Sequence, residues 1–121
     1  MTLEFKLRYK TDMVEAEVSG TFEPDSARVF FTRVLAFAQE QNIQKILVDA
    51  QALTGDVSTL ERFNFGIFMA EQKLESKKIA FIAPTDVVWP DHFMEAVASN
   101  RGINVKVTTT RTEALKWLNS D

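Results

Sequence analysis

One stretch of the chain, Lys45 to Leu74, most constrains what the sequence can fold into. It opens with the apolar run Ile46-Leu47-Val48, which predicts a buried parallel strand that ends at Asp49. The sequence Ser58-Thr59-Leu60-Glu61 then has the spacing of a capping box, in which serine and glutamate side chains each accept from the other's backbone amide. A strand, a polar loop and a helix in this order indicate an α/β domain.

Strands and helices alternate along the rest of the chain. Alternating apolar and polar residues predict antiparallel strands from Leu3 to Tyr9 and from Val14 to Val18, with the basic face of one across from the acidic face of the other. Helical spacing predicts a helix from Pro24 to Gln41. The later patterns predict a strand from Lys78 to Ala83, a helix that opens at Trp89-Pro90 and stops before Gly102, a strand from Ile103 to Val107, and a last helix that begins at the capping box Thr110 to Glu113.

This order predicts an α/β fold with a mixed five-stranded sheet: strand, strand, helix, and then three strand-helix pairs. Because crossovers between parallel strands are right-handed, the last four strands should run parallel after the antiparallel hairpin. The polar faces of the hairpin lead us to expect helices mainly on one side of the sheet. A length of 121 residues predicts a single domain over residues 1–121.

Composition narrows the classes of function. The chain has no cysteine, which excludes thiol catalysis and thiolate metal sites and fits a reducing compartment. No stretch approaches the ~20 apolar residues that span a bilayer, and the amino-terminal residues lack a signal-peptide core, so we expect a cytoplasmic protein. The net charge is −3, with lysines and arginines scattered, so nucleic acid is not an expected partner.

Three segments carry a resemblance to a known family: ILVDAQALTGDVSTLERFNFGIFMAEQ from residue 46, KIAFIAP from residue 78, and NRGINVKVTTTRTEALKWL from residue 100. With the order of elements, they make the chain similar to the STAS/SpoIIAA-like group of small bacterial proteins. The resemblance implies a non-enzymatic regulatory module that binds another protein. Its best-known members are anti-sigma-factor antagonists, which engage a kinase through the loop after the central strand and are turned off when a serine there is phosphorylated.

The sequence departs from the antagonists at that loop. Residues 49–56 read DAQALTGD, where the antagonists have an Asp-Ser-Ser-Gly type of sequence. The nearby hydroxyls of Thr54 and Ser58 do not match the antagonists' serine in register. The chain is therefore expected to lack their phosphoserine motif, and Ser58 is interpreted as a helix cap.

We expect a binding surface at the carboxyl ends of the parallel strands, where open α/β sheets bind ligands. Its expected residues are Asp49, Leu53, Thr54, Gly55, Asp56, Ser58, Asp86 and Trp89. The first hypothesis is that they engage another protein. The alternative is a small anion or a lipid, with the free amides of the helix that begins at Ser58 as its polar handle. A divalent cation between Asp49 and Asp86 is a further alternative, although such aspartates more often accept loop amides.

No cofactor, metal or catalytic residue is expected. His92 is the single histidine of the chain. It has no serine nucleophile in an elbow turn and no second ligand at metal spacing. We therefore expect a protein that is not an enzyme.

The second helix carries more apolar residues than one buried stripe needs. Leu60, Phe63, Ile67, Ala70 and Leu74 form the stripe that we expect to face the sheet. Phe65, Phe68 and Met69 lie outside it. Three explanations remain open for these residues: packing against other helices of the chain, a homodimer built on them, or contact with an apolar ligand such as a lipid tail.

Overall fold

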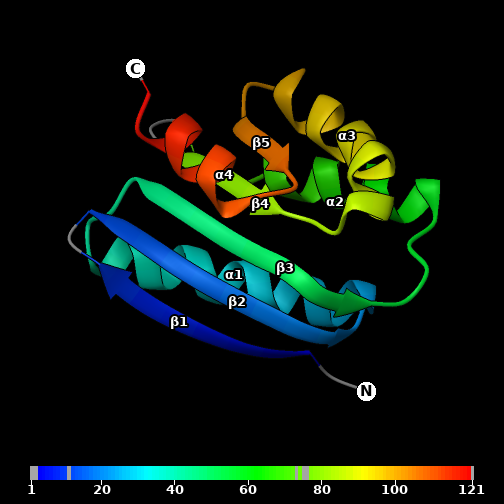
Figure 1. Ribbon diagram of the computed structural model, residues 1–121, viewed down its shortest axis with the longest axis horizontal. Coiled ribbons are helices and arrows are strands. Elements are labelled where there is room, and N and C mark those ends of the chain that lie inside the picture. Colours follow the sequence, from blue (N-terminus) through cyan, green and yellow to red (C-terminus); the bar gives the residue numbers. More distant parts are fainter. Residues whose placement is uncertain (1–2, 11, 73, 75–76, 121) are drawn as a thin grey trace.

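The computed structural model describes residues 3–10, 12–72, 74 and 77–120, with the side chains of residues 85–91 excepted. The chain forms a five-stranded sheet in the order β1-β2-β3-β4-β5, with helices packed on both faces (Figure 1). The predicted α/β class and order of elements are confirmed. The elements are β1 Glu4–Lys10, β2 Met13–Thr21, α1 Pro24–Glu40, β3 Lys45–Thr54, α2 Thr59–Ala70, β4 Lys78–Ile82, α3 Thr85–Ser99, β5 Asn104–Thr108 and α4 Arg111–Leu118.

The strand order explains which helices share a face of the sheet. β1 pairs with β2 antiparallel, and β2, β3, β4 and β5 pair in parallel, as the sequence predicts. Each parallel crossover steps to the next strand in the same direction, so right-handed crossovers place α1, α2 and α3 on one face. α4 follows the last strand and is not a crossover, and it lies on the opposite face over β4 (Figure 1).

The central strand is buried on both faces because its side chains alternate between two cores. Ile46 and Val48 of β3 belong to the main core, which lies between the sheet and α1, α2 and α3. Leu47 belongs to a smaller core under α4, together with Ala114 and Leu118. The continuous apolar run at residues 46–48 therefore predicts the environment of this strand correctly.

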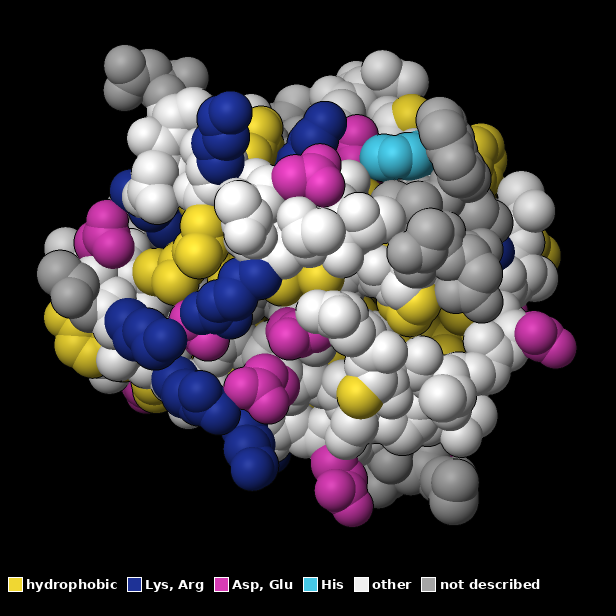
Figure 2. All heavy atoms as spheres, in the orientation of Figure 1, with side chains coloured by type: hydrophobic (Ala, Val, Ile, Leu, Met, Phe, Trp, Pro, Cys, Tyr) yellow, Lys and Arg dark blue, Asp and Glu magenta, His cyan; other side chains and the backbone are white. Residues whose placement is uncertain are grey.

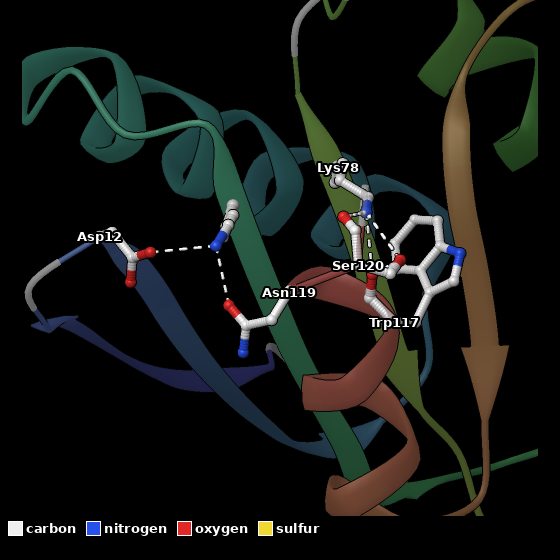
Figure 3. Close-up of polar contacts among 6 residues, drawn as sticks. Asp12, Lys78, Trp117, Asn119 and Ser120 are labelled. Carbon is white, nitrogen blue, oxygen red and sulfur yellow. Dashed lines mark hydrogen bonds and ion pairs between the residues drawn. The ribbon is translucent and has the colours of Figure 1, made fainter.

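Two lysines at the start of the parallel strands hold the end of α4 (Figure 3). The Lys78 ammonium donates to the backbone carbonyls of Trp117 and Ser120, each at 2.8 Å, and lies 4.7 Å from the centre of the Trp117 ring. The Lys45 ammonium donates to Asp12 at 3.0 Å and to Asn119 at 2.7 Å. A cation at a helix carboxyl terminus satisfies carbonyls that have no partner within the helix.

The face of the β1–β2 hairpin that points away from α1 carries charges of both signs. Basic side chains of β1 and acidic side chains of β2 interleave over this part of the surface (Figure 2). Arg8 lies 2.8 Å from Glu17, and Lys10 lies 2.9 Å from Glu15. The predicted pairing of a basic face with an acidic face is confirmed.

The third helix begins earlier than its sequence pattern predicts. We expected it to open at Trp89-Pro90, but α3 begins at Thr85, directly after Pro84. Pro90 suggested a first turn because proline is common there, yet a proline further along a helix costs one backbone hydrogen bond and need not end it. Residues 85–89 are therefore part of a helix and do not form a free loop.

Candidate functional site

The strand that leads to the candidate site is longer than the sequence predicts. β3 continues past Asp49 to Thr54, so residues 49–54 belong to the sheet rather than to a loop. Between the pairs Glu17↔Asp49 and Ser19↔Ala52, β3 has one residue more than β2, which makes a β-bulge. The Asp49 carboxylate accepts the backbone amide of Gln51 at 3.1 Å, within this bulge. Asp49 therefore stabilises a strand irregularity and does not end the strand.

A short loop joins β3 to α2 at the carboxyl edge of the sheet. Thr54 ends the strand, and its hydroxyl donates to the carbonyl of Gly20 at 3.1 Å. Gly55 then turns the chain at φ 101°, where a Cβ atom would lie 3.1 Å from the Thr21 methyl group. Only glycine adopts this conformation without strain, so the direction of the loop is fixed by Gly55.

The start of α2 is closed by the predicted capping box. The Ser58 hydroxyl accepts the Glu61 amide at 3.1 Å, and the Glu61 carboxylate accepts the Ser58 amide at 2.8 Å. Two of the amides that could hold an anion are thus already bonded, and the Glu61 carboxylate adds a negative charge beside them. The backbone amides of Ser58 and Glu61 are therefore not available to bind an anion.

The burial of α2 corrects the predicted stripe. Leu60 is 67% exposed and Phe63 is 37% exposed, whereas Met69 is fully buried. Phe65 and Phe68 pack edge-on against Phe31 of α1, with ring centres 5.6 Å and 6.1 Å apart. Three residues outside the predicted stripe thus contact the core, together with Ala70 and Leu74 from the stripe itself. Packing within the chain, the first of the three explanations, thus accounts for the apolar character of Phe65, Phe68 and Met69.

A glycine explains why α2 turns this face to the core. A Cβ atom at Gly66 would lie 2.8 Å from Cγ1 of Val97 and 3.1 Å from the carbonyl of Met94, both in α3. Because Gly66 has no side chain, α2 and α3 approach each other closely there, and this contact sets the rotation of α2. The apolar pattern of α2 alone does not contain this information.

The rotation of α2 exposes an apolar surface next to the loop. We call this surface the α2–α3 patch. It consists of Leu60 and Phe63 of α2, Phe93 of α3, and Arg101, which lies just after the end of α3. Phe93 is 43% exposed and stacks on Phe63 with ring centres 6.4 Å apart, and the Arg101 guanidinium lies 5.9 Å from the centre of the Phe63 ring. Three of the five large apolar side chains that are exposed among the described residues lie in this patch, so exposed apolar area is concentrated there.

The structure brings only part of the predicted site together. Thr54, Gly55, Asp56 and Ser58 are exposed around the loop, and Leu53 is half-buried beneath it. Asp49 lies on the other face of the sheet, in a shallow groove with Lys6 and Glu17. The side chains of Asp86 and Trp89 fall outside the described residues. Sequence reasoning missed Leu60, Phe63 and Phe93 as surface residues because their spacing is typical of a buried stripe.

A small cavity opens beside the same loop. It has a volume of about 110 Å³ and lies between the carboxyl ends of β3 and β4 and the first turns of α1 and α2. Its lining is mostly apolar and includes Phe22, Phe30, Ala50 and Phe65. The cavity and the α2–α3 patch are the two features of this edge that could receive another molecule.

A metal site needs several ligand side chains close together, and a membrane span needs a long apolar helix. Among the described side chains, no three histidine or carboxylate groups cluster closely enough to hold a metal ion. His92 lies 3.2 Å from Glu95, one turn later in α3. Within the same described residues, no helix has the length and apolar character needed to cross a membrane.

The sheet order, the helix placement and the loop after the central strand define the STAS/SpoIIAA-like fold, as the resemblance implied. Two solved structures are similar to the chain over nearly its whole length. The first is an anti-sigma factor antagonist from Mycobacterium paratuberculosis, with 10% identity, a TM-score of 0.65, and coverage of 98% of this chain and 96% of that one. The second is an uncharacterised DUF3478 protein with a SpoIIAA-like fold from Shewanella loihica, with 17% identity, a TM-score of 0.57, and coverage of 97% and 93%. No protein-family model matches the chain, and no curated protein gives a significant match.

Proposed function

We propose that this protein is a non-enzymatic regulatory module that binds another protein through the α2–α3 patch and the adjoining loop Gly55 to Ser58. The observation that carries the proposal is the cluster of Leu60, Phe63 and Phe93 on the surface. Aromatic side chains of this kind are common anchors in protein interfaces. The anti-sigma factor antagonist with the same fold supports a regulatory role of this type.

The chemistry of the patch defines the partner. Complete burial of one large apolar side chain contributes about 1.5–3 kcal/mol, and the three anchors start only partly exposed, so together they supply less than the ~8 kcal/mol of a micromolar complex. For a complex of that affinity, we expect the exposed loop residues Asp56 and Ser58 to share in the interface. Arg101 adds a positive charge beside Phe63. The partner is expected to present apolar side chains with a carboxylate next to them.

The hydroxyls near the patch serve the structure of this surface. Thr54 donates to the Gly20 carbonyl, and Ser58 caps α2. Both hydrogen bonds favour a binding surface that is already ordered when Thr54 and Ser58 are unmodified. We therefore infer that the interaction does not depend on a phosphorylated serine in the loop.

Site-specific crosslinking tests whether the patch meets a partner. A photoreactive phenylalanine analogue at position 60 or 93 should form an adduct with a distinct protein in cells of the source organism. The matched control is position 29, because Val29 of α1 is 56% exposed and lies outside the patch. The same adducts from position 29, or no protein adduct from positions 60 and 93, would contradict the proposal.

A further inference from the structure

We propose that the cavity at the carboxyl ends of β3 and β4 binds the end of an unbranched alkyl chain. This cavity shares no residue with the α2–α3 patch, although it lies beside the loop Gly55 to Ser58 that adjoins the patch, and its test needs no protein partner. Ala50 and Phe81 of the sheet, Phe30 of α1 and Phe65 of α2 contribute to its walls. Side chains from the sheet, from α1 and α2, and Met94 from α3 thus line the space.

The size of the cavity sets the length of chain that it holds. A cavity of ~150 Å³ lined by apolar side chains accommodates benzene, whereas the volume here is about 110 Å³. By proportion, the space accommodates about four carbon atoms. A longer chain would bury its end and leave the remainder outside.

The lining favours an uncharged apolar group over water or an anion. Glu61 and Arg62 are the charged residues among those that line the cavity. The Glu61 carboxylate accepts the Ser58 amide, and the Arg62 guanidinium donates to the Val57 carbonyl, so both charged groups bond to the loop backbone. The Thr54 hydroxyl is likewise bonded to Gly20. A bound water needs two to four hydrogen-bond partners, and this mostly apolar lining offers too few of them.

The polar end of the ligand would lie at the loop. Thr54 and Gly55 are the exposed members of the lining, so the solvent side of the cavity is at these two residues. The conformation of Gly55 holds this opening in place, because the chain there adopts a φ of 101°. A ligand with one polar end and one alkyl end fits this arrangement.

Titration with n-alkanols from propan-1-ol to octan-1-ol, followed by amide NMR shifts, tests the proposal. Each added methylene should strengthen binding about fourfold until about four carbons are buried, and further methylenes should add little. The largest shifts should come from Ala50, Leu53 and Val57. Alkanols that give no saturable shifts at these residues, or shifts without dependence on chain length, would overturn the proposal.

Two neighbouring alanines of β3 provide matched variants. Ala50 lines the cavity, whereas Ala52 lies in the groove on the other face of the sheet. Ala50→Leu should weaken octan-1-ol binding at least tenfold, and Ala52→Leu should leave it unchanged. If Ala50→Leu does not fold, Ala83→Val narrows the same cavity and should give the same loss. Binding that is equal in wild type and in the folded cavity variant would refute the site.

Vesicles distinguish the two sources of an alkyl chain. Cosedimentation with phosphatidylcholine vesicles that is lost in Ala50→Leu would support the site and assign it to a lipid tail. Octan-1-ol binding without cosedimentation would support it and assign it to a free molecule with a short alkyl chain. A protein that shows neither behaviour does not bind alkyl chains in this cavity.

Discussion

Replacement of Glu15 by glutamine should weaken the fold in a manner that depends on pH. Glu15 is 3% exposed, and its carboxylate accepts from Lys10 of β1 at 2.9 Å and from Arg111 at the start of α4. Burial raises the pKa of Glu15, but the hydrogen bonds and positive charges of Arg111 and Lys10 lower it by more, so the pKa lies below its ordinary value. This carboxylate therefore links the hairpin to α4 mainly in its ionised form.

The structure sets the size of this effect. A hydrogen bond to a charged group contributes roughly 1 kcal/mol more than a neutral one, and Glu15→Gln converts two of them. Lys10 and Arg111 are about half-exposed and can be solvated in the variant, which limits the loss. We expect the free energy of unfolding at pH 7 to fall by about 1–2 kcal/mol in Glu15→Gln.

The sign of the pH dependence follows from the lowered pKa. The stabilisation from Glu15 is fully present above the pKa of the unfolded chain, about 4.5, and is lost as the pH falls through the lower pKa of the folded protein. Urea unfolding should thus show a difference between wild type and Glu15→Gln at pH 7 that shrinks below about pH 4. Glu17→Gln is the control, because the exposed pair of Glu17 with Arg8 should contribute less than about 1 kcal/mol. An equal difference at pH 7 and pH 3 would refute this reasoning.

The remaining predictions concern α2. Phe68→Ala should lower the free energy of unfolding by about 3 kcal/mol, because Phe68 packs on the core, whereas Phe63→Ala should cost about 1–2 kcal/mol, because Phe63 is 37% exposed. Equal losses in urea unfolding would contradict the observed rotation of α2. Gly66→Ala should destabilise by about 1–3 kcal/mol despite the better helix propensity of alanine, because its Cβ meets Val97; an unchanged thermal midpoint would argue against that contact. Ser58→Ala should lower the free energy of unfolding by about 1 kcal/mol, because the N-cap is lost. No change in urea unfolding would show that this cap does not stabilise the protein.

Local sequence signals predict most of the elements. The alternation in β1 and β2, the apolar run of β3 and the two helix caps depend on residues close in the chain, and their outcomes match the predictions. The turn at Gly102 also follows, since its φ of 92° is the conformation that glycine favours. These features need no knowledge of distant contacts.

Two features depend on contacts between distant residues, and the sequence did not predict them. β3 continues through Ala50 and Gln51 because β2 provides a pairing partner and Asp49 bonds the bulged amide. α2 faces the core with Phe68 rather than Phe63 because Gly66 lets α3 approach. Thr54 at the end of β3, and Gly55 and Ser58 after it, lie at the carboxyl edge of the sheet. The exposed aromatic residues of the candidate site follow from the rotation of α2, which the sequence pattern does not contain.

The most direct test of the proposed function is the affinity of the crosslinked partner, once purified, for three forms of the protein. Isothermal titration would compare wild type with Phe63→Glu, in the α2–α3 patch, and with Val29→Glu, which is equally a change of an exposed apolar residue to a carboxylate. Circular dichroism would confirm that all three are folded. The account predicts that Phe63→Glu weakens binding at least tenfold and that Val29→Glu leaves it unchanged. Equal affinity of all three forms would show that the patch is not the binding surface.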